Sequence, residues 1–400
     1  MLISFISFYP ILWAVGVAII FWPALLFLTI GKWKNCHPTF ISNALLFIGI
    51  IEILSVPIGW YYFQVGIDRV LSALVNSTVW ITSSFLVSYN LENTQIRKFI
   101  KLLINIALLQ GLVVISAKIL FPVNLPIPIL HSTMKNFGAN SSAFANNEII
   151  YIDWLDGSAF RTHGIMANAT WAGGYSALAL LLLLKYQHLN LKEVFRNAIK
   201  YMVLSYVVLL SLSRSVLIAL FLSMISGVIL NFVFKRGATG KISIFIFGLV
   251  ILSSIMIIII TSGNLQILFE SINQTRSGSL QTRSSIYQTT INLIQSHPLP
   301  LLGYGVKPSG EGLVASVATH STPLGVLFKG GLLGLVAYIL LILGSFKKLF
   351  VLKSSLGFSL FIFIVLWSLL EDLDGGHLIP LYLAIIFRRE IKSTFRNDYK

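Results

Sequence analysis

Arginine and histidine side chains gather in one long polar stretch of an otherwise apolar chain. The stretch from Thr261 to Thr322 carries Arg276, Arg283, His297 and His320. Arginine pairs with phosphate oxygens through two parallel hydrogen bonds and stays charged. Histidine, with an unperturbed pKa of about 6.5, can take a hydroxyl proton near neutral pH. These residue types together predict a site that binds a diphosphate and activates a hydroxyl group.

A third arginine, Arg214, lies in the middle of the apolar run from Ile199 to Phe234. A charged side chain at the centre of a bilayer is costly. We therefore expect this run to form two helices joined by a turn at Ser213 to Ser215, with Arg214 at the surface. Arg214, Arg283 and His320 would then meet on one face of the molecule.

These residues would suit a lipid diphosphate substrate and a transfer reaction that releases diphosphate. Negative charge develops on the leaving oxygen in such a step, and cations placed there in advance lower the barrier without a metal. His320 is a better candidate for the general base than His297, because His297 precedes Pro298 and ends a helix, whereas His320 lies between hydroxyl residues. The sequence therefore predicts an enzyme with no metal and no cofactor.

The elements that hold these residues should be membrane-spanning helices. Hydrophobic residues make up 56% of the 400 residues and charged residues only 11%, and the mean hydropathy is +0.85. The fold class that we predict is an all-α integral membrane protein with about 11 transmembrane helices (about 10 to 12), each of roughly 20 apolar residues. The expected spans cover residues 8–30, 41–63, 70–88, 99–121, 165–184, 199–213, 215–234, 242–262, 322–343, 355–370 and 377–387.

Two long outward-facing loops separate groups of spans. Long loops in compact proteins are usually functional or disordered, and we expect these two to contain short amphipathic helices. The expected organisation is N-terminal transmembrane helices at 1–121, a first external loop at 122–164, central transmembrane helices at 165–262, a second, catalytic external loop at 263–321, and C-terminal transmembrane helices with a basic cytoplasmic tail at 322–400.

One amphipathic helix is predicted in the second loop. Arg283, Tyr287, Ile291 and Ile294 recur at helical spacing, so they should share one helix face that lies at the outer surface. Tyr287 is thus placed beside Arg283 as a substrate-binding candidate. The full set of substrate-binding candidates is Arg161, Arg276, Tyr287 and Lys307.

Lysine and arginine collect in alternate loops, and this distribution orients the chain. Cytoplasmic loops carry an excess of these residues. The chain follows this rule when its N-terminus lies outside and its C-terminus lies inside. The net charge of +15 then reflects topology and an attraction to anionic membrane lipids, and it does not indicate a nucleic-acid partner. The single cysteine, Cys36, excludes an internal disulfide.

Four short patterns occur in a fixed order between residues 160 and 345. They are Arg161-Thr-His-Gly164, Ser211-Leu-Ser-Arg214, Thr282-Arg283-Ser-Ser-Ile-Tyr287 followed by His297-Pro298 and Gly303-Tyr-Gly305, and Thr319-His320-Ser321 followed by Lys329-Gly-Gly331. In this order and spacing the chain resembles the O-antigen ligase and polymerase superfamily of bacterial envelope glycan enzymes. Where that family commonly has His-Asn, this chain has His320-Ser321.

The resemblance implies a catalytic set of Arg214, Arg283 and His320. These residues would hold an undecaprenyl-diphosphate-linked glycan donor and activate an acceptor, which is either another glycan or the lipid A core. The resemblance also implies a multi-pass protein of the bacterial cytoplasmic (inner) membrane with its active site on the periplasmic face, and a chain-length regulator as a further partner.

The function that we favour from the sequence is that of a polymerase of undecaprenyl-diphosphate-linked repeat units, because the chain is compact and has no appended soluble domain. A ligase that transfers the glycan to lipid A core or to protein is the alternative. A lipid-linked oligosaccharide flippase is the alternative of another class, but a flippase needs a polar path through the bilayer, and only Glu52 offers an ionisable group at depth. Glu52 is either functional or neutral and hydrogen-bonded to a neighbouring helix.

Overall fold

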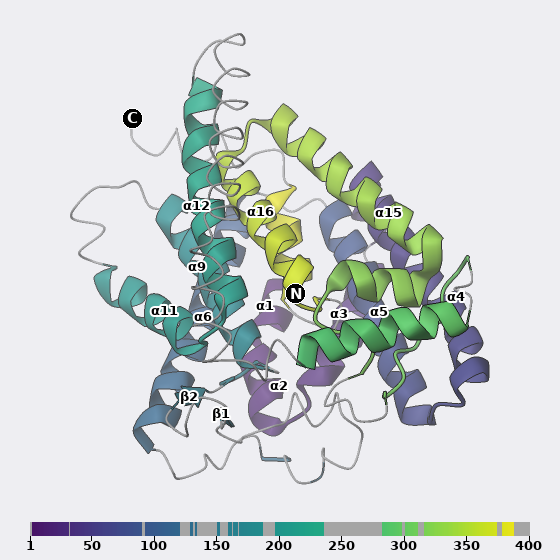
Figure 1. Cartoon of the computed structure of the whole chain (residues 1–400). Coiled ribbons are helices and arrows are strands. Elements are labelled where there is room, and N and C mark those ends of the chain that lie inside the picture. Colours follow the sequence, from purple (N-terminus) through teal and green to yellow (C-terminus); the bar gives the residue numbers. More distant parts are fainter. Residues whose placement is uncertain are drawn as a thin grey trace, which may run out of the picture.

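The computed structural model describes residues 2–31, 33–89, 93–120, 129–130, 133, 150–152, 159–161, 163–166, 168–186, 197–235, 282–297, 301–310, 316–373 and 378–387. Within these ranges the chain is mainly helical (Figure 1). The helices are α1 (Leu2–Ser7), α2 (Tyr9–Val15), α3 (Phe21–Ile30), α4 (Phe40–Phe63), α5 (Ile67–Ser88), α6 (Asn93–Leu120), α9 (Ala169–Tyr186), α11 (Ala198–Leu210), α12 (Arg214–Lys235), an unlabelled helix at 282–296, α15 (Thr322–Leu352), α16 (Ser355–Leu370) and α17 (Ile379–Ile386), with 3-10 turns η1 (Ala18–Ile20) and η2 (Trp33–Asn35).

Five of the described helices, α4, α5, α6, α12 and α15, are long and apolar enough to cross a membrane. Shorter apolar helices accompany them, so the chain is an all-α multi-pass membrane protein, as the composition predicts. The two short strands β1 (Ile150–Ile152) and β2 (Ala159–Arg161) pair antiparallel, with Tyr151 opposite Phe160. The total of about 11 spans stays a prediction, and the expected span at 242–262 lies outside the described residues.

The N-terminal apolar segment differs from the prediction of one span at 8–30. Helix α2 ends at Val15, because Gly16 adopts a left-handed conformation with φ 102° and its amide bonds back to the carbonyls of Leu12 and Trp13. Glycine in this conformation is a common helix stop. The chain continues through η1 into α3. The segment is therefore two short helices and a turn.

The long apolar run around Arg214 is split into two helices, as the cost of burying its charge predicts. Helix α11 ends at Leu210 and α12 begins at Arg214 itself. The turn thus covers residues 211–213, two residues earlier than expected, and Leu212 adopts φ 49° in it. Arg214 occupies the first position of α12.

Helix α15 is broken at Gly331, which has φ 62° and ψ −159°. In a continuous helix, the amides of residues 332 and 333 would bond the carbonyls of Phe328 and Lys329. Here those carbonyls instead accept hydrogen bonds from the amides of Tyr304 and Gly305, both at 2.9 Å. The segment 301–305 therefore replaces the missing helical bonds, which satisfies backbone groups that would be costly to leave unpaired.

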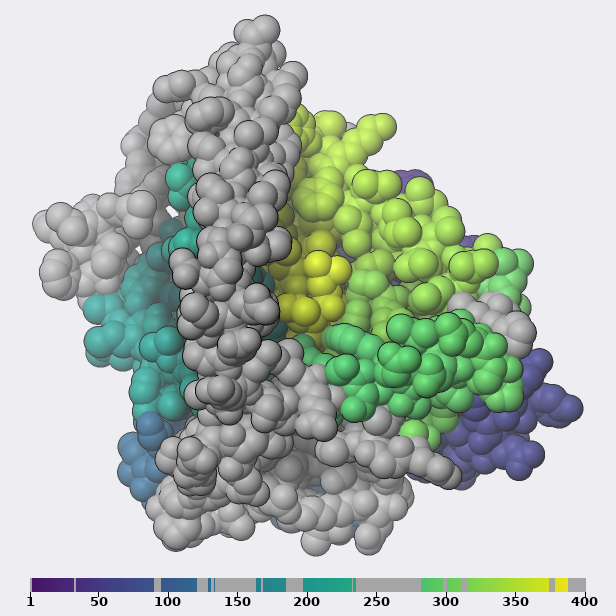
Figure 2. All heavy atoms as spheres, in the orientation of Figure 1, coloured from purple at the N-terminus to yellow at the C-terminus, as the bar shows by residue number. Residues whose placement is uncertain are grey.

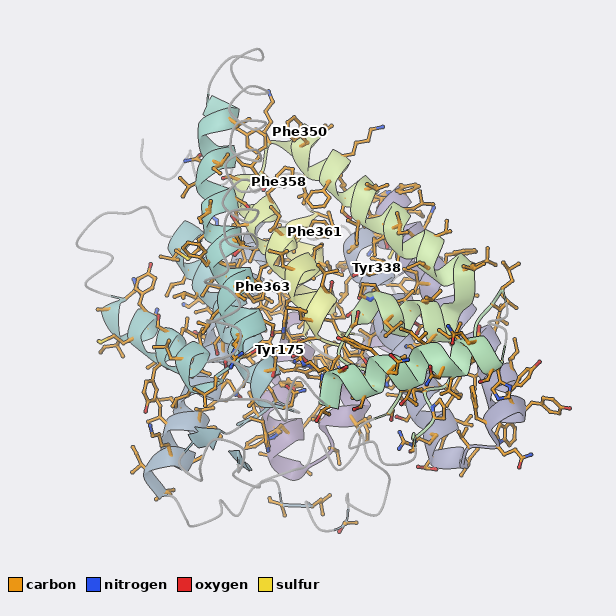
Figure 3. All side chains as sticks on the ribbon, viewed as in Figure 1. Tyr175, Tyr338, Phe350, Phe358, Phe361 and Phe363 are labelled. Atoms are coloured by element: carbon orange, nitrogen blue, oxygen red, sulfur yellow. The ribbon has the colours of Figure 1, made fainter. Side chains whose placement is uncertain are left out.

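Helix α16 packs antiparallel to both α12 and the C-terminal part of α15 (Figure 1). Phe234 at the end of α12 contacts Phe350 and Phe358, with ring centroids 5.6 and 6.0 Å apart. In Figure 3, Phe350 of α15 lies at one end of α16, and Phe358, Phe361 and Phe363 follow along α16. Because α12 and α16 run in opposite directions, the start of α12 and the end of α16 lie at the same end of the molecule.

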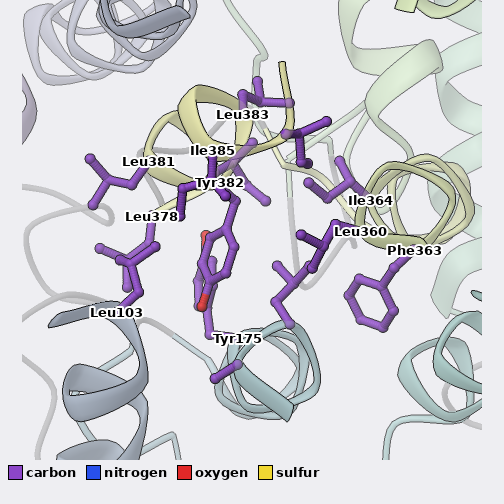
Figure 4. Close-up of a cluster of buried hydrophobic side chains, with 14 of the residues drawn as sticks. Leu103, Tyr175, Leu360, Phe363, Ile364, Leu378, Leu381, Tyr382, Leu383 and Ile385 are labelled. Carbon is purple, nitrogen blue, oxygen red and sulfur yellow. The ribbon is translucent and has the colours of Figure 1, made fainter. Parts of the chain in front are cut away.

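A tightly packed aromatic centre joins α9, α16 and α17. The ring of Tyr175 stacks on Tyr382 with centroids 6.0 Å apart and meets the edge of Trp367 at 5.7 Å. Figure 4 shows Tyr175 and Tyr382 face to face, surrounded by leucine and isoleucine side chains of the neighbouring helices. This packing fixes α16 against α9.

A buried ion pair joins three further helices. Lys329 of α15 lies 2.7 Å from Glu52 Oε2 of α4, and Ser77 of α5 donates a hydrogen bond to the same oxygen at 3.0 Å. Both charged side chains are almost fully buried, at 3% and 0% exposure. The expectation that Glu52 is the only ionisable group at depth is therefore wrong, because Lys329 accompanies it.

Candidate active site

Glu371, the residue that follows α16, contacts two residues proposed from the sequence. Its Oε1 atom lies 2.7 Å from a terminal nitrogen of Arg283, and its Oε2 atom lies 3.8 Å from His320 Nδ1. The Glu371 side chain is 5% exposed, whereas His320 is 32% exposed. A buried carboxylate thus faces an arginine and a half-buried histidine from separate segments of the chain.

Arg283 holds the helix at 282–296 against the end of α16. One terminal nitrogen donates to Glu371, and the other donates to the carbonyl of Leu370 at 2.7 Å. The last carbonyls of a helix lack partners within the helix, and a cation there is also favoured by the helix dipole. The arginine is therefore fixed by two directed bonds, which is a use that suits its forked geometry.

Lys307 forms a second ion pair, with Asp372, directly beside the first. Its ammonium also lies over the first turn of α15, since a Cβ atom added to Gly325 would be 2.8 Å from Lys307 Nζ. The glycine leaves the space in which this ammonium lies. Two cations and two consecutive carboxylates are consequently packed at the start of α15.

His320 has an unusual backbone conformation. Its φ of 62° is left-handed, which is uncommon for a residue with a side chain. Tyr287 donates a hydrogen bond to the His320 carbonyl at 2.9 Å, and Thr322 donates through its hydroxyl to the Glu371 carbonyl at 2.8 Å. These bonds hold the backbone of His320 and the side chain of Thr322, two residues further on.

The charges of this site also act on the pKa of Tyr287. Burial raises the pKa of its phenol; the nearby Arg283 lowers that pKa, and Glu371 and Asp372 raise it further. The phenol therefore stays protonated at neutral pH and remains a donor to the His320 carbonyl.

The residues proposed from the sequence are distributed as follows. Arg283, Tyr287, Lys307 and His320 meet around Glu371 and Asp372. Arg214 lies at the same end of the molecule, because it begins α12 and α12 runs antiparallel to α16. Arg161 is the last residue of β2, and Arg276 lies outside the described residues.

Comparison with known proteins finds a family match over part of the chain. The family model described as O-antigen ligase matches residues 201–339. This match over part of the chain supports the resemblance to the O-antigen ligase and polymerase superfamily. The matched segment includes Arg214, Arg283 and His320, whereas Glu371 and Asp372 follow it. No curated protein matches the chain.

The matched segment contains one helix whose buried face differs from the prediction. In the helix at 282–296, Ile286 and Thr290 are fully buried, whereas Ile291 is 45% exposed. Thr290 accepts a hydrogen bond from the amide of Ala318 at 2.8 Å, which ties the helix to the loop before His320. The face that carries Arg283 and Tyr287 thus packs against protein, and Ile291 points away from it. On the face shown in Figure 2, this helix (green) lies directly beside α15 (yellow-green).

Glu371 and Asp372 are the site residues that sequence reasoning missed. They begin the acidic segment Glu371-Asp372-Leu-Asp374, which directly follows an apolar span. A clustered set of acids at a span end, on the side proposed to hold the cations, is a signal that could have singled them out. Among the described residues there is no group of three or more His, Cys, Asp or Glu arranged to hold a metal ion.

Proposed function

We propose that this protein is a membrane glycosyltransferase that polymerises undecaprenyl-diphosphate-linked oligosaccharide repeat units. The observation that carries the proposal is the meeting of Arg283, Lys307 and His320 around Glu371 and Asp372, inside a chain whose residues 201–339 match the O-antigen ligase family. A pair of cations beside a half-buried histidine suits a diphosphate leaving group and a hydroxyl nucleophile.

In the proposed reaction His320 accepts the proton of an acceptor hydroxyl. The hydroxyl oxygen forms a bond to the anomeric carbon of the donor sugar, while the bond from that carbon to the diphosphate oxygen breaks. The electron pair of the broken bond stays on undecaprenyl diphosphate. Arg283 and Arg214, with Lys307, stabilise this developing charge. No metal or cofactor is needed for the atoms and charges to balance.

A ligase is the second candidate, because the matching family model is described as O-antigen ligase. Both reactions use the same donor and the same leaving group, so they share the site. They differ in the acceptor, which is a second lipid-linked glycan for a polymerase and lipid A core or protein for a ligase.

The membrane placement in this proposal follows the basic loops. The N-terminus lies outside, the C-terminus lies in the cytoplasm, and the site faces the periplasm of a bacterial inner membrane. Anionic lipids at the inner leaflet would contact the basic loops. A chain-length regulator would act from the same outer face.

The flippase alternative is less well supported by the buried charges. A flippase requires polar groups along a path through the bilayer. Glu52 and Lys329 are both buried and bond to one another, with Ser77 on the same carboxylate. A mutually neutralising pair of this kind suits the joining of helices better than transport of a charged lipid.

The test uses a strain that lacks this protein and is complemented with wild type or His320→Ala. We expect wild type to restore the envelope glycan ladder and His320→Ala to abolish it, at equal protein abundance in the membrane. Single repeat units on the acceptor in the deletion strain identify a polymerase, and long polymer left on the lipid carrier identifies a ligase. A ladder that is unchanged by the deletion rejects both.

A further inference from the structure

The two cations proposed to bind the donor diphosphate already hold carboxylates. Arg283 contacts Glu371 at 2.7 Å, and Lys307 contacts Asp372. The two acids are consecutive in the chain, so one short segment covers both cations. Two adjacent carboxylates present paired anionic oxygens much as a diphosphate does, which makes them chemical competitors for the same donors.

Arg283 already uses both of its terminal nitrogens in hydrogen bonds within the protein. One donates to Glu371 and the other to the Leu370 carbonyl. A diphosphate that binds the guanidinium at the position of the carboxylate must displace Glu371. Displacement costs less when the incoming anion carries more charge than the outgoing one, as a diphosphate does.

The second carboxylate oxygen of Glu371 lies on the side of His320, which is the direction in which the displaced side chain can rotate. Glu371 Oε2 is 3.8 Å from His320 Nδ1, which is beyond hydrogen-bond length. The Glu371 backbone is held by Thr322, whose amide and hydroxyl bond its carbonyl at 3.2 and 2.8 Å. A rotation of the side chain alone would thus bring the carboxylate to the imidazole.

We propose that Glu371 and Asp372 occupy the donor site in the resting enzyme, and that the donor diphosphate displaces Glu371 from Arg283 onto His320 Nδ1. The proposal rests on the proposed function. Glu371 is then a positioning residue, which holds the imidazole so that Nε2 faces the acceptor hydroxyl. Asp372 only competes for Lys307, because His320 faces Glu371.

The test measures binding of inorganic diphosphate to the purified full-length protein in detergent by isothermal titration calorimetry. Glu371→Gln keeps a carbonyl acceptor for Arg283, and Asp372→Asn does the same for Lys307. We expect diphosphate to bind roughly tenfold more tightly to Glu371→Gln and several-fold more tightly to Asp372→Asn, because each variant removes a charge-assisted competitor. Asp68→Asn, which removes an exposed acid at the start of α5, is the matched control and should bind diphosphate as wild type does.

Measurements of turnover distinguish the roles of the Glu371 and Asp372 carboxylates. At saturating lipid-linked donor, Glu371→Gln should lower kcat about tenfold or more, since His320 loses its orienting partner. Asp372→Asn should lower KM for the donor with a much smaller effect on kcat. A purely structural role would not lower KM in one variant and kcat in the other. If Glu371→Gln does not accumulate in the membrane, diphosphate binding by Asp372→Asn alone tests whether the carboxylates compete with diphosphate.

The proposed displacement of the carboxylates by diphosphate is overturned if Glu371→Gln and Asp372→Asn bind diphosphate no more tightly than wild type does. It is also overturned if Asp68→Asn tightens diphosphate binding by the same amount. The two proposals fail in different ways. If wild type restores the glycan ladder of a deletion strain but the carboxylate variants bind diphosphate as wild type does, only the displacement of the carboxylates by diphosphate is rejected. If the ladder does not depend on the protein at all, the transferase function is rejected.

Discussion

His320 has both a strained backbone and a buried carboxylate beside its ring. A left-handed residue with a side chain costs free energy of about 1–3 kcal/mol and persists where neighbouring bonds impose it. Tyr287 bonds the His320 carbonyl, and Thr322, two residues further on, bonds the Glu371 carbonyl. The conformation is a reason to treat His320 as functional that is independent of its residue type.

Arg283→Lys is the residue-scale prediction. A lysine ammonium cannot reach the Leu370 carbonyl and Glu371 in the same planar geometry. Loss of one charged hydrogen bond is worth about 1.5–3 kcal/mol, so we expect glycan transfer to fall roughly 10- to 100-fold at normal membrane abundance. The measurement is the rate of ladder formation in membranes with added donor.

The control for this variant is Arg69→Lys. Arg69 also uses two terminal nitrogens, on the hydroxyls of Ser316 and Ser309 at 2.6 and 2.7 Å. It bonds two neutral hydroxyl groups, whereas Arg283 bonds a carboxylate. Transfer that drops equally in both variants would show that any lost arginine fork disturbs the loop, and the special role of Arg283 would be abandoned.

At the scale of elements, the break in α15 decides how the site is assembled. Residues 322–330 and the helix beyond Gly331 diverge, which allows Thr322 to reach Glu371 while Tyr338 reaches Ser368 at 2.9 Å. A straight helix would carry its N-terminus away from the end of α16. The segment 301–305, which fills the break, also leads into Lys307.

Gly331→Ala tests the break, with Gly330→Ala as its neighbour control. Gly331 has φ 62° and ψ −159°, a region that is essentially restricted to glycine. A Cβ atom at Gly330 would meet nothing closer than 3.6 Å. We expect Gly331→Ala to lower the free energy of unfolding by about 1–3 kcal/mol or more and to reduce transfer, and Gly330→Ala to change neither appreciably.

Thermal unfolding in detergent and membrane abundance measure both alanine variants. Equal stability of the two proteins would mean that the backbone at Gly331 relaxes into a helical conformation without loss. The break would then not be required for the site.

At the scale of the whole molecule, the Glu52–Lys329 pair connects α4, α5 and α15. It lies beside the break, because the Lys329 carbonyl accepts a hydrogen bond from the Gly305 amide. A buried pair of this kind contributes less through net attraction than through the cost of leaving either charge alone. We therefore expect the pair to select one arrangement of the three helices.

Lys329→Met and Glu52→Gln, alone and together, test this role. Either single change leaves one buried group without its charged partner and should cost about 3–5 kcal/mol when a charge is left uncompensated. The double variant should recover most of that loss, since no charge remains buried. Unfolding temperature in detergent is the measurement, and a double variant less stable than both single ones would contradict the helix-joining role.

Much of this protein could be predicted from the sequence because hydropathy and helical periodicity are local. The membrane class, the positions of α4, α5, α6 and α16, and the split of the run around Arg214 all follow from short windows of residues. Arginine and histidine could be proposed as site residues because their chemistry suits diphosphate and proton transfer. The superfamily match then supports the resemblance over residues 201–339.

Only the tertiary structure decided which partners these residues have. Glu371 and Asp372 reach Arg283 and Lys307 across 88 and 65 positions of sequence, and no local pattern encodes such a separation. The break in α15 is visible in the sequence only as Gly330-Gly331, while the bonds that fill it come from residues 301–305. These pairings depend on how the helices pack, because packing alone brings distant charges within bonding distance.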